Sequence, residues 1–278
     1  MVGIEISSKI KLAVKIADGD NTVVNVRGRE VGGRKVTVIA GPCSVETREQ
    51  LLDAARAVKA AGASMLRGGA FKPRTRPYGF QGLGEEGLKI LAEARDETGL
   101  PIVTEVMEPD KVELVEAYAD VLQVGARNSQ NYPLLKKLGK AKKPVLLKRG
   151  LANTIEEWLS AAEYILHGGN PDVILCERGL RTHGKLTRFT MDLSAIAIIK
   201  EVSHLPIIAD PSHGTGIRSL ISPMSKAAVA VGADGLIVEV HPNPEEALCD
   251  GPQSIQPPEF RTLMEELRSV ASSVGREL

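Results

Sequence analysis

Positive charge gathers in one short stretch of the chain. Residues 65–82 read MLRGGAFKPRTRPYGFQG and carry four cations, Arg67, Lys72, Arg74 and Arg76. Any one of them alone is more often a solvated surface charge, but like charges gathered at low dielectric repel unless an anion neutralises them. The planar fork of arginine matches carboxylate and phosphate oxygens. The stretch therefore predicts a site for a small substrate, or two substrates, with several negative charges.

Four other side chains are of types that bind metal ions. They are Cys43, His213, Glu239 and Asp250. A thiolate, an imidazole and two carboxylates suit a borderline divalent transition metal better than magnesium or calcium. No short ligand motif such as a CxxC pair accompanies them, and a free cysteine is most often a small buried hydrophobe. Spacing alone therefore leaves a metal site and a buried core as open alternatives.

A regular alternation of elements from residue 36 onward must position these residues. Eight short apolar runs occur at residues 36–41, 65–71, 102–106, 121–127, 145–150, 173–179, 207–213 and 235–241. Segments with apolar residues at helical spacing, such as TREQLLDAARAVKAAG, lie between them, and several end in glycine. Apolar strands joined by helical crossovers indicate a parallel sheet covered on both faces, and eight units in about 240 residues match a (β/α)8 TIM barrel. A doubly wound open sheet is the alternative, but it would not normally need eight units.

Chemistry in such barrels takes place at the carboxyl ends of the strands and in the loops that follow. The polar residues fall there, namely Arg67, Glu105, Arg127, Lys148, Arg149, Glu177, Arg178, Asp210 and Glu239. At least four strands thus deliver Arg or Lys to one mouth. Because a barrel closes its eighth strand against its first, we expect Cys43 to lie near Glu239 and Asp250.

Residues 1–35 do not follow the alternation, and we expect an N-terminal extension there, before a catalytic barrel at residues 36–278. TVVNV (22–26) and KVTV (35–38), separated by RGREVGG, predict a β-hairpin that leads into the first barrel strand and is able to plug its N-terminal mouth. About 35 residues are too few for a separate regulatory domain.

Composition excludes several classes of function. The 278 residues include 35 Lys and Arg and 35 Asp and Glu, so overall charge does not support a nucleic-acid-coating or membrane-surface role. No apolar run reaches the roughly 18 residues of a membrane span, and MVGIEISSKIKLAVK lacks the apolar core of a secretion signal. Three widely spaced cysteines do not form a disulfide framework. We expect a cytoplasmic protein that binds neither nucleic acid nor membrane.

Several residues have ordinary interpretations. Cys176 lies inside an apolar strand and Trp158 inside a helix with apolar neighbours, so we expect both to be core residues. Cys249 precedes Asp250 in a loop and is either a bystander or a neighbour of the metal.

Eight motifs carry a resemblance to a known family. They are AGPCSVE, LRGGAFKPRT, PYGFQG, VGARNSQN, LLKRG, CERGLRT, DPSHGTG and EVHPNPEEALCDGPQS, in this order. The order resembles 3-deoxy-D-arabino-heptulosonate 7-phosphate (DAHP) synthases, closest to the class whose core is similar to 3-deoxy-octulosonate 8-phosphate synthase, without an added regulatory domain. The resemblance covers about residues 22–265, and KPRT with PYGFQG and DPSHGTG is a specific signal.

The resemblance implies an activity and a cofactor. A DAHP synthase is a transferase that condenses phosphoenolpyruvate with D-erythrose 4-phosphate and water, with C–O cleavage, to give DAHP and phosphate, the entry step of the shikimate pathway to aromatic amino acids. One divalent transition metal ion (manganese, iron, cobalt or zinc) would orient and polarise the aldehyde as a Lewis acid without a redox role. Its implied ligands are Cys43, His213, Glu239 and Asp250.

The resemblance also implies roles for the other site residues. Those that bind phosphoenolpyruvate would be Arg67, Lys72, Arg127, Lys148 and Arg178. Those that bind erythrose 4-phosphate would be Arg74, Thr75, Asp210 and Asp250. The catalytic group would be Lys72, Arg67, Glu105 and His213, with Lys72 as a proton donor and Glu105 hydrogen-bonded to the attacking water.

Two departures from the family pattern concern loops. Arg76 stands where a small hydroxyl residue is usual, and THGKLTRF (182–189) differs from the common sequence. Family members of this build often form tetramers, so a homotetramer is expected. Because residues 1–35 leave room for a hairpin only, we expect no inhibition by phenylalanine, tyrosine or tryptophan.

Three alternatives remain. An octulosonate synthase would use arabinose 5-phosphate on the same barrel, although KPRT without an intervening Asn favours the four-carbon sugar. A metal-dependent hydrolase or class II aldolase would normally take several histidines to its metal, and of the five histidines in this chain only His213 falls in the candidate site. A non-catalytic barrel that binds sugar phosphates is the third.

Overall fold

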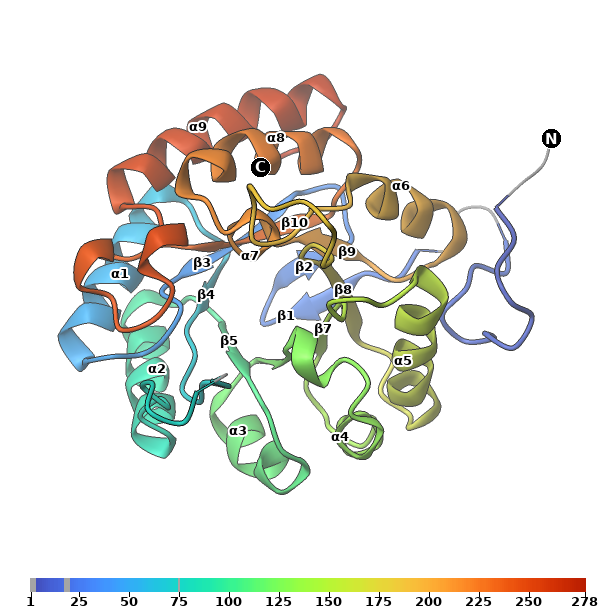
Figure 1. Ribbon diagram of the computed structural model, residues 1–278, viewed down its shortest axis with the longest axis horizontal. Coiled ribbons are helices and arrows are strands. Elements are labelled where there is room, and N and C mark those ends of the chain that lie inside the picture. Colours follow the sequence, from blue (N-terminus) through green and yellow to red (C-terminus); the bar gives the residue numbers. More distant parts are fainter. Residues whose placement is uncertain (1–3, 18–20, 75) are drawn as a thin grey trace.

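Eight parallel strands close into a barrel with the order β10-β3-β4-β5-β6-β7-β8-β9 in the computed structural model, which describes residues 4–17, 21–74 and 76–278 (Figure 1). The strands are β3 (Thr37–Gly41), β4 (Met65–Arg67), β5 (Ile102–Glu105), β6 (Val121–Val124), β7 (Val145–Lys148), β8 (Val173–Glu177), β9 (Ile207–Ala209) and β10 (Gly235–Glu239). The predicted (β/α)8 TIM barrel is confirmed. Most predicted runs extended beyond the strands at their carboxyl ends, where loops with site residues begin.

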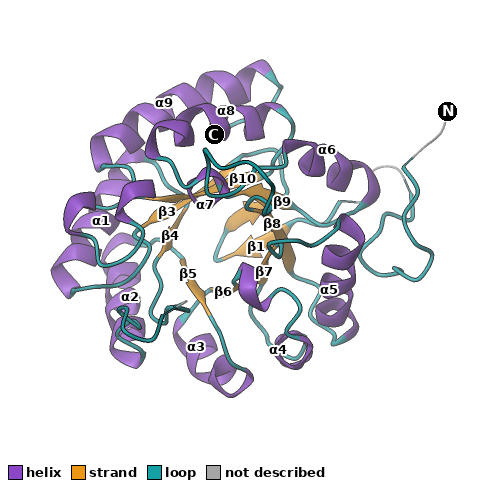
Figure 2. Cartoon of the chain, in the orientation of Figure 1, coloured by secondary structure: helices purple, strands orange, loops and turns teal. Residues whose placement is uncertain are grey.

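Helices surround the strands, as the purple ring around the orange strands in Figure 2 shows. They are α1 (Arg48–Ala61), α2 (Glu85–Thr98), α3 (Val112–Tyr118), α4 (Tyr132–Leu138), α5 (Ile155–His167), α6 (Leu193–Val202), α8 (Ile221–Ala230) and α9 (Pro257–Ser273). A shorter helix, α7 (Pro211–Thr215), follows β9. Short 3-10 turns are η1 (Pro109–Lys111), η2 (Ala126–Asn128), η3 (Arg218–Leu220), η4 (Pro244–Glu246) and η5 (Gly251–Gln253). In α1, the Thr47 side chain accepts from the Gln50 backbone N–H at the start, and Gly62 ends the helix in the left-handed conformation, as the sequence pattern predicted.

The inside of the barrel is built in layers by the two-residue period of the strands. One residue of each strand forms an apolar layer, made of Ile39, Met65, Val103, Val121, Leu146, Ile174, Ile208 and Ile237. The next layer is made by the residue that comes two positions after each of these in the sequence. Its members are Gly41, Arg67, Glu105, Gln123, Lys148, Cys176, Asp210 and Glu239. The period therefore turns one end of the lumen into core and the other into a polar layer. Cys176, although it stands in the second layer, is fully buried and packs against the apolar one, and Trp158 is fully buried in α5, as predicted.

The N-terminal hairpin pairs β1 (Val24–Val26) with β2 (Arg29–Val31), so the predicted second strand at 35–38 is wrong. The observed strand lies inside the expected RGREVGG turn, and KVTV leads into β3. Arg27 and Gly28 at the tip both have positive φ, 48° and 81°, as a type I′ turn requires. Such turns usually have Asn, Asp or Gly at the first position. Because Arg27 occupies that position here, the sequence pattern did not indicate the turn.

The hairpin lies across the amino end of the lumen. Val24, Val26 and Val31 belong to the same buried cluster as the apolar layer, and Figure 1 shows β1 and β2 at the centre of the ring. The hairpin therefore acts as the expected plug, while a domain boundary at residue 35 stays a prediction.

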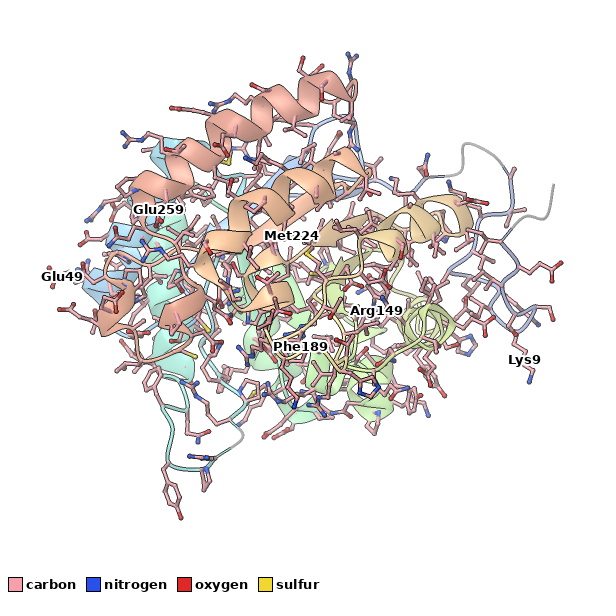
Figure 3. All side chains as sticks on the ribbon, turned by 45° about the horizontal axis from the view of Figure 1, so that its top comes forward. Lys9, Glu49, Arg149, Phe189, Met224 and Glu259 are labelled. Carbon is pink, nitrogen blue, oxygen red and sulfur yellow. The ribbon has the colours of Figure 1, made fainter. Side chains whose placement is uncertain are left out.

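The segment before the hairpin docks on the outside of the barrel. The Glu163 carboxylate of α5 accepts from the backbone N–H groups of Lys11, Leu12 and Ala13 at 3.0, 2.5 and 2.6 Å. Figure 3 shows Lys9 at the edge of the molecule, on the side opposite Glu49 of α1. Within the described part of the chain, no helix combines the length and the apolar character that crossing a bilayer requires.

Candidate active site

A cavity of about 160 Å³ opens where the strands end. Seven of its described lining residues are basic, namely Arg67, Lys72, Arg74, Arg127, Lys148, Arg178 and Arg188. Only Glu105 and Asp250 among the described lining residues are acidic. Six predicted cations thus converge on one concave site whose charge favours an anionic ligand, whereas Arg76 of the opening stretch is exposed and does not line it.

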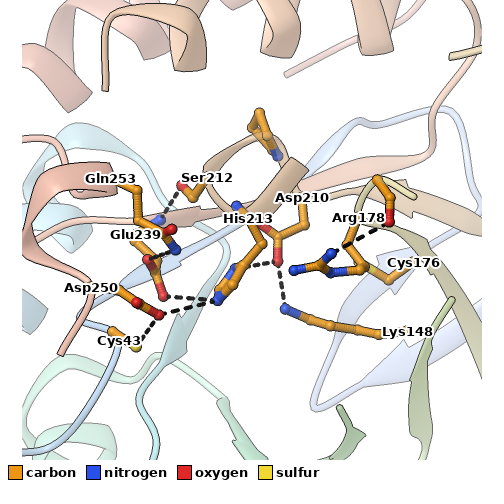
Figure 4. Close-up of polar contacts among 12 residues, drawn as sticks. Cys43, Lys148, Cys176, Arg178, Asp210, Ser212, His213, Glu239, Asp250 and Gln253 are labelled. Carbon is orange, nitrogen blue, oxygen red and sulfur yellow. Dashed lines mark hydrogen bonds and ion pairs between the residues drawn. The ribbon is translucent and has the colours of Figure 1, made fainter. Parts of the chain in front are cut away.

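The four predicted metal-binding side chains also converge. One ligand atom from each of Cys43, His213, Glu239 and Asp250 lies within 4.8 Å of the others. Asp250 Oδ2 is 3.5 Å from Cys43 Sγ, and His213 Nε2 is 3.4 Å from Glu239 Oε1 (Figure 4). Pairing of β3 with β10, which sets Gly41 beside Glu239, brings the two ends of the chain together here.

The DPSHGTG motif forms a short helix that aims His213. Asp210 caps α7, because its Oδ1 accepts from the His213 backbone N–H at 2.9 Å, and Pro211 takes the first helical position. Asp210 Oδ2 lies 2.8 Å from His213 Nδ1. A carboxylate partner places the proton on Nδ1, and the Nε2 lone pair then faces Glu239 and Asp250.

Burial dominates the electrostatics of Glu239 and His213. It raises the pKa of Glu239 to about 7, with a further contribution from Cys43, and it lowers the pKa of His213. Burial also acts to raise the pKa of Asp210, but the charges of His213 and Lys148 outweigh it and hold that pKa well below its usual range. Glu239 Oε1 is buried and has no hydrogen-bond partner among the described residues. A neutral imidazole beside an unsatisfied carboxylate oxygen is an arrangement that a cation would complete.

Besides Asp250, the sulfur of Cys43 has two polar neighbours. Lys72 Nζ is 3.0 Å away and Cys249 Sγ is 3.2 Å away. The hydrogen bond to Cys249 and burial raise the pKa of Cys43, whereas the same hydrogen bond lowers the pKa of Cys249 to about 7. The thiolate form is therefore favoured at Cys249 over Cys43, and the charge of Lys72 contributes to lowering the Cys249 pKa. Cys249, whose role the sequence left open, is therefore a neighbour of the candidate ligand Cys43.

Buried cations form the floor of the cavity. Arg67 donates from Nη2 to the Cys43 carbonyl at 3.3 Å, and its Nε and Nη1 have no hydrogen-bond partner among the described residues. Its Nη1 nevertheless lies 3.2 Å from Glu239 Oε1. Lys148 Nζ lies 2.5 Å from Asp210 Oδ2. Open donors on a buried guanidinium are suited to bind an incoming anion.

Arg178 and Glu105 reach the cavity from other strands. The Arg178 guanidinium lies over the Phe189 ring, 4.1 Å from its centre, in a cation–π contact. Glu105 accepts a hydrogen bond from Gln123 Nε2 at 3.3 Å, and both residues line the cavity.

Not all of the residues expected to bind the aldose phosphate line the cavity. Arg74 lines the cavity, and its guanidinium donates to the carbonyls of Phe80 (2.7 Å) and Leu248 (3.1 Å). Thr75 lies outside the described residues. Asp210 is fully buried, its oxygens are occupied by His213 and Lys148, and it does not line the cavity. Its contact with the sugar stays a prediction, and the geometry favours a role in positioning His213 and Lys148.

The sequence interpretation missed three residues of the site. Gln123 was detectable, because it stands two positions after Val121 in an alternating strand. Gln253, whose Nε2 donates to Glu239 Oε2 at 2.7 Å, and Arg188 lie in loops, where no periodicity indicates direction.

Comparison with known proteins places this site in context. The model of the DAHP synthetase I family matches residues 18–274. A phospho-2-dehydro-3-deoxyheptonate aldolase of Thermotoga maritima is 52% identical over 265 residues, which cover 95% of this chain and 78% of the relative. A 2-dehydro-3-deoxyphosphooctonate aldolase of Syntrophotalea carbinolica is 32% identical over 261 residues, which cover 87% of this chain and 93% of the relative.

Solved structures agree in fold. The crystal structure of phospho-2-dehydro-3-deoxyheptonate aldolase (DAHP synthase) from Thermotoga maritima superposes with a TM-score of 0.95 at 50% identity, over 99% of this chain and 80% of that one. A truncated form of 3-deoxy-D-arabino-heptulosonate 7-phosphate synthase from the same organism superposes with a TM-score of 0.91 at 48% identity, over 97% and 99% of the two chains.

Proposed function

The chain belongs to the DAHP synthetase I family, and we propose how its residues condense phosphoenolpyruvate with D-erythrose 4-phosphate and water to DAHP and phosphate. This transferase reaction is the first step of the shikimate pathway. The observation that carries the assignment of roles is the meeting of seven cations at a single cavity with one group of metal-type donors, of which His213 and Asp250 line that cavity. The octulosonate-forming alternative has weaker support, because the relative from Syntrophotalea carbinolica is only 32% identical.

The cations bring two anionic reactants together. Phosphoenolpyruvate carries a carboxylate and a phosphate, and its proposed ligands are Arg67, Lys72, Arg127, Lys148 and Arg178. Without them it would repel a second phosphate ester. Holding both reactants in one geometry turns a bimolecular step into an effectively unimolecular one.

We propose Cys43, His213, Glu239 and Asp250 as ligands of one divalent ion, with manganese, iron, cobalt and zinc as candidates. The fit is supported by the Nε2 lone pair of His213, the unsatisfied Oε1 of Glu239 and the Lys72 ammonium beside the Cys43 sulfur. When bound, the ion would supply Lewis-acid polarisation of the aldehyde oxygen.

The chain's own side chains handle protons and water. The methylene carbon of phosphoenolpyruvate bonds to the aldehyde carbon, and the aldehyde oxygen takes up a proton. Lys72 is the proposed donor, because it lines the cavity and its ammonium stays protonated: the neighbouring Cys43 and Cys249 raise its pKa despite its burial. Water adds to the carbon that carries phosphate, with Glu105 orienting it, and cleavage of the C–O bond releases phosphate.

The sugar phosphate is proposed to occupy the outer part of the cavity. Arg74 and Thr75 would bind its phosphate, and Asp210 and Asp250 its hydroxyls. A homotetramer in the cytoplasm is the proposed form of the enzyme, which light scattering and cell fractionation would test.

One assay tests the proposal. Phosphoenolpyruvate consumption is measured with erythrose 4-phosphate and with arabinose 5-phosphate, before and after metal removal. Fixed anchors for aldehyde and phosphate disfavour a longer sugar, since a misplacement of about 1 Å can cost on the order of 100-fold in rate. More efficient turnover of the five-carbon sugar would overturn the assignment. Arg76→Ser is a control, because Arg76 is exposed and does not line the cavity.

A further inference from the structure

Arg188 is anchored at two points before its guanidinium reaches the cavity. It lies in the loop between β8 and α6, and its backbone N–H donates to the Thr215 carbonyl of α7 at 2.8 Å. Its stem packs on Gly216, which ends α7 with φ 71°; a side chain there would come within 2.6 Å of the Arg188 Cβ. The stem is therefore held against the helix that carries His213.

The guanidinium then contacts the loop after β10. Nη1 donates to Gln253 Oε1 at 2.9 Å and to Asp250 Oδ1 at 3.3 Å. Gln253 in turn donates from Nε2 to Glu239 Oε2 at 2.7 Å. One side chain thus restrains one oxygen of each acidic donor, directly for Asp250 and through an amide for Glu239.

The opposite oxygens face the other two donors. Asp250 Oδ2 lies 3.5 Å from Cys43 Sγ and 3.8 Å from His213 Nε2, and Glu239 Oε1 lies 3.4 Å from the same nitrogen. Asp250 also has φ 53°, a left-handed conformation that non-glycine residues seldom adopt. The contact with Arg188 is a restraint on this carboxylate from outside its own loop.

We propose that Arg188 is a positioning residue of the metal centre, which aligns Asp250 and, through Gln253, Glu239. The inference rests on the proposed metal ligands and adds a residue to which neither composition nor the motifs assigned a role. A guanidinium suits the task, because its planar fork carries several donors, whereas lysine presents a single flexible ammonium.

Arg188 also lines the cavity, and so a role as a direct ligand of the sugar phosphate is the competing interpretation. The two roles differ in what they change. A positioning residue alters metal affinity in the absence of substrate. A substrate ligand alters the KM for erythrose 4-phosphate and leaves metal affinity intact.

The test compares Arg188→Met with Lys185→Met, a matched loss of charge at an exposed residue of the same loop that does not line the cavity. Metal-free protein is titrated with Co²⁺ and Zn²⁺ against a chromophoric chelator, and the cobalt–thiolate absorption is recorded. We expect Arg188→Met to raise the metal dissociation constant about 10- to 100-fold and to shift the cobalt spectrum. Lys185→Met should match the wild type. At saturating metal, the KM for erythrose 4-phosphate should be unchanged.

A double-variant cycle tests the route through Gln253. Gln253→Met should also weaken metal binding, and Arg188→Met should add less in that background than alone, because the two side chains act in series. Additive effects would overturn the shared route. Arg188→Lys, which keeps the charge and most of the stem, should bind metal with intermediate affinity and serves if Arg188→Met does not fold.

The possible failures are distinguishable. Wild-type protein that binds no Co²⁺ or Zn²⁺ would remove the proposed metal site itself. Wild-type binding with an equally tight Arg188→Met would overturn only the role of Arg188, and a raised KM in that variant would make Arg188 a substrate ligand instead.

Discussion

Cys43 is the residue on which the candidate metal group depends most. It is the only sulfur donor in that group, and its Sγ lies 3.0 Å from the Lys72 ammonium. We predict that Cys43→Ala loses bound metal and activity but keeps the fold, since it removes a ligand and little volume. Metal content, kinetics and circular dichroism check this.

Cys176→Ala is the control for this prediction, because Cys176 is equally buried but packs against the apolar cluster of the lumen and is not in the candidate metal group. It should retain the metal. A strong chelator should abolish turnover in the wild type, and manganese, iron, cobalt or zinc should restore it. Full activity of metal-free protein would exclude the proposed role of the metal.

Lys72 joins the candidate metal group to the anion pocket. Its Nζ donates to the carbonyl and sits beside the sulfur of Cys43, and its side chain lines the cavity. We predict that Lys72→Met lowers kcat/KM roughly 30-fold to several-thousand-fold, because one buried charge-assisted contact and the proposed proton donor are lost. The corresponding loss of transition-state stabilisation is about 2–5 kcal/mol. Lys89→Met, at an exposed residue of α2, should be silent in the same steady-state assay. Unchanged kinetics of Lys72→Met would contradict both proposed roles.

At the scale of elements, a buried ion network ties β7 and β8 to α6. Arg149 Nη1 lies 2.8 Å from Glu177 Oε2 and 3.0 Å from Asp192 Oδ2, and Asp192 caps α6. Arg149 does not line the cavity, whereas the preceding Lys148 does, because successive residues of a strand point to opposite faces. Its loss should therefore act on stability and not on the chemistry.

We predict that Arg149→Met destabilises the fold by about 3–5 kcal/mol at neutral pH, because Glu177 is left buried without its partner. Burial already raises the pKa of Glu177 above its ordinary value, and losing Arg149 raises it further. At pH values between the pKa of Glu177 in the unfolded chain and its higher pKa in the folded variant, the native state binds more protons than the unfolded state. The stability of the variant should therefore decline as pH increases through this range and rise as pH falls through it. Urea unfolding at several pH values measures this. In Arg149→Met/Glu177→Gln that pH dependence should vanish, and its persistence would point to another group.

At the scale of the whole molecule, the hairpin makes the barrel's amino end part of the core. Val24 is fully buried among the lumen residues, while the adjacent Val23 is 45% exposed. We predict that Val24→Ala costs about 1.5–3 kcal/mol in the free energy of unfolding, from lost burial and the cavity left behind. Val23→Ala should change it by less than about 0.5 kcal/mol. Equal effects of the two variants would show that the hairpin does not seal the lumen.

The sequence by itself determined the architecture and most of the site. Eight apolar runs with helical segments between them are sufficient for the barrel, because period and count are local properties of the chain. The rule that chemistry lies at the carboxyl ends of barrel strands then selected Arg67, Lys148, His213 and Glu239 correctly as residues that meet. Gln123 could have been added from the same alternation.

Only the tertiary structure decided how those residues face one another. Barrel closure already predicted that Cys43 lies near Asp250, but only the structure shows that Oδ2 faces Cys43 while Oδ1 accepts from Arg188. Asp210 aims His213 from a buried position that strand spacing could not reveal. Arg188 and Gln253 stand in irregular loops, where side-chain direction follows from packing against distant segments and not from any period. The hairpin register likewise depended on an arginine with positive φ, a conformation that this residue type does not indicate in a sequence.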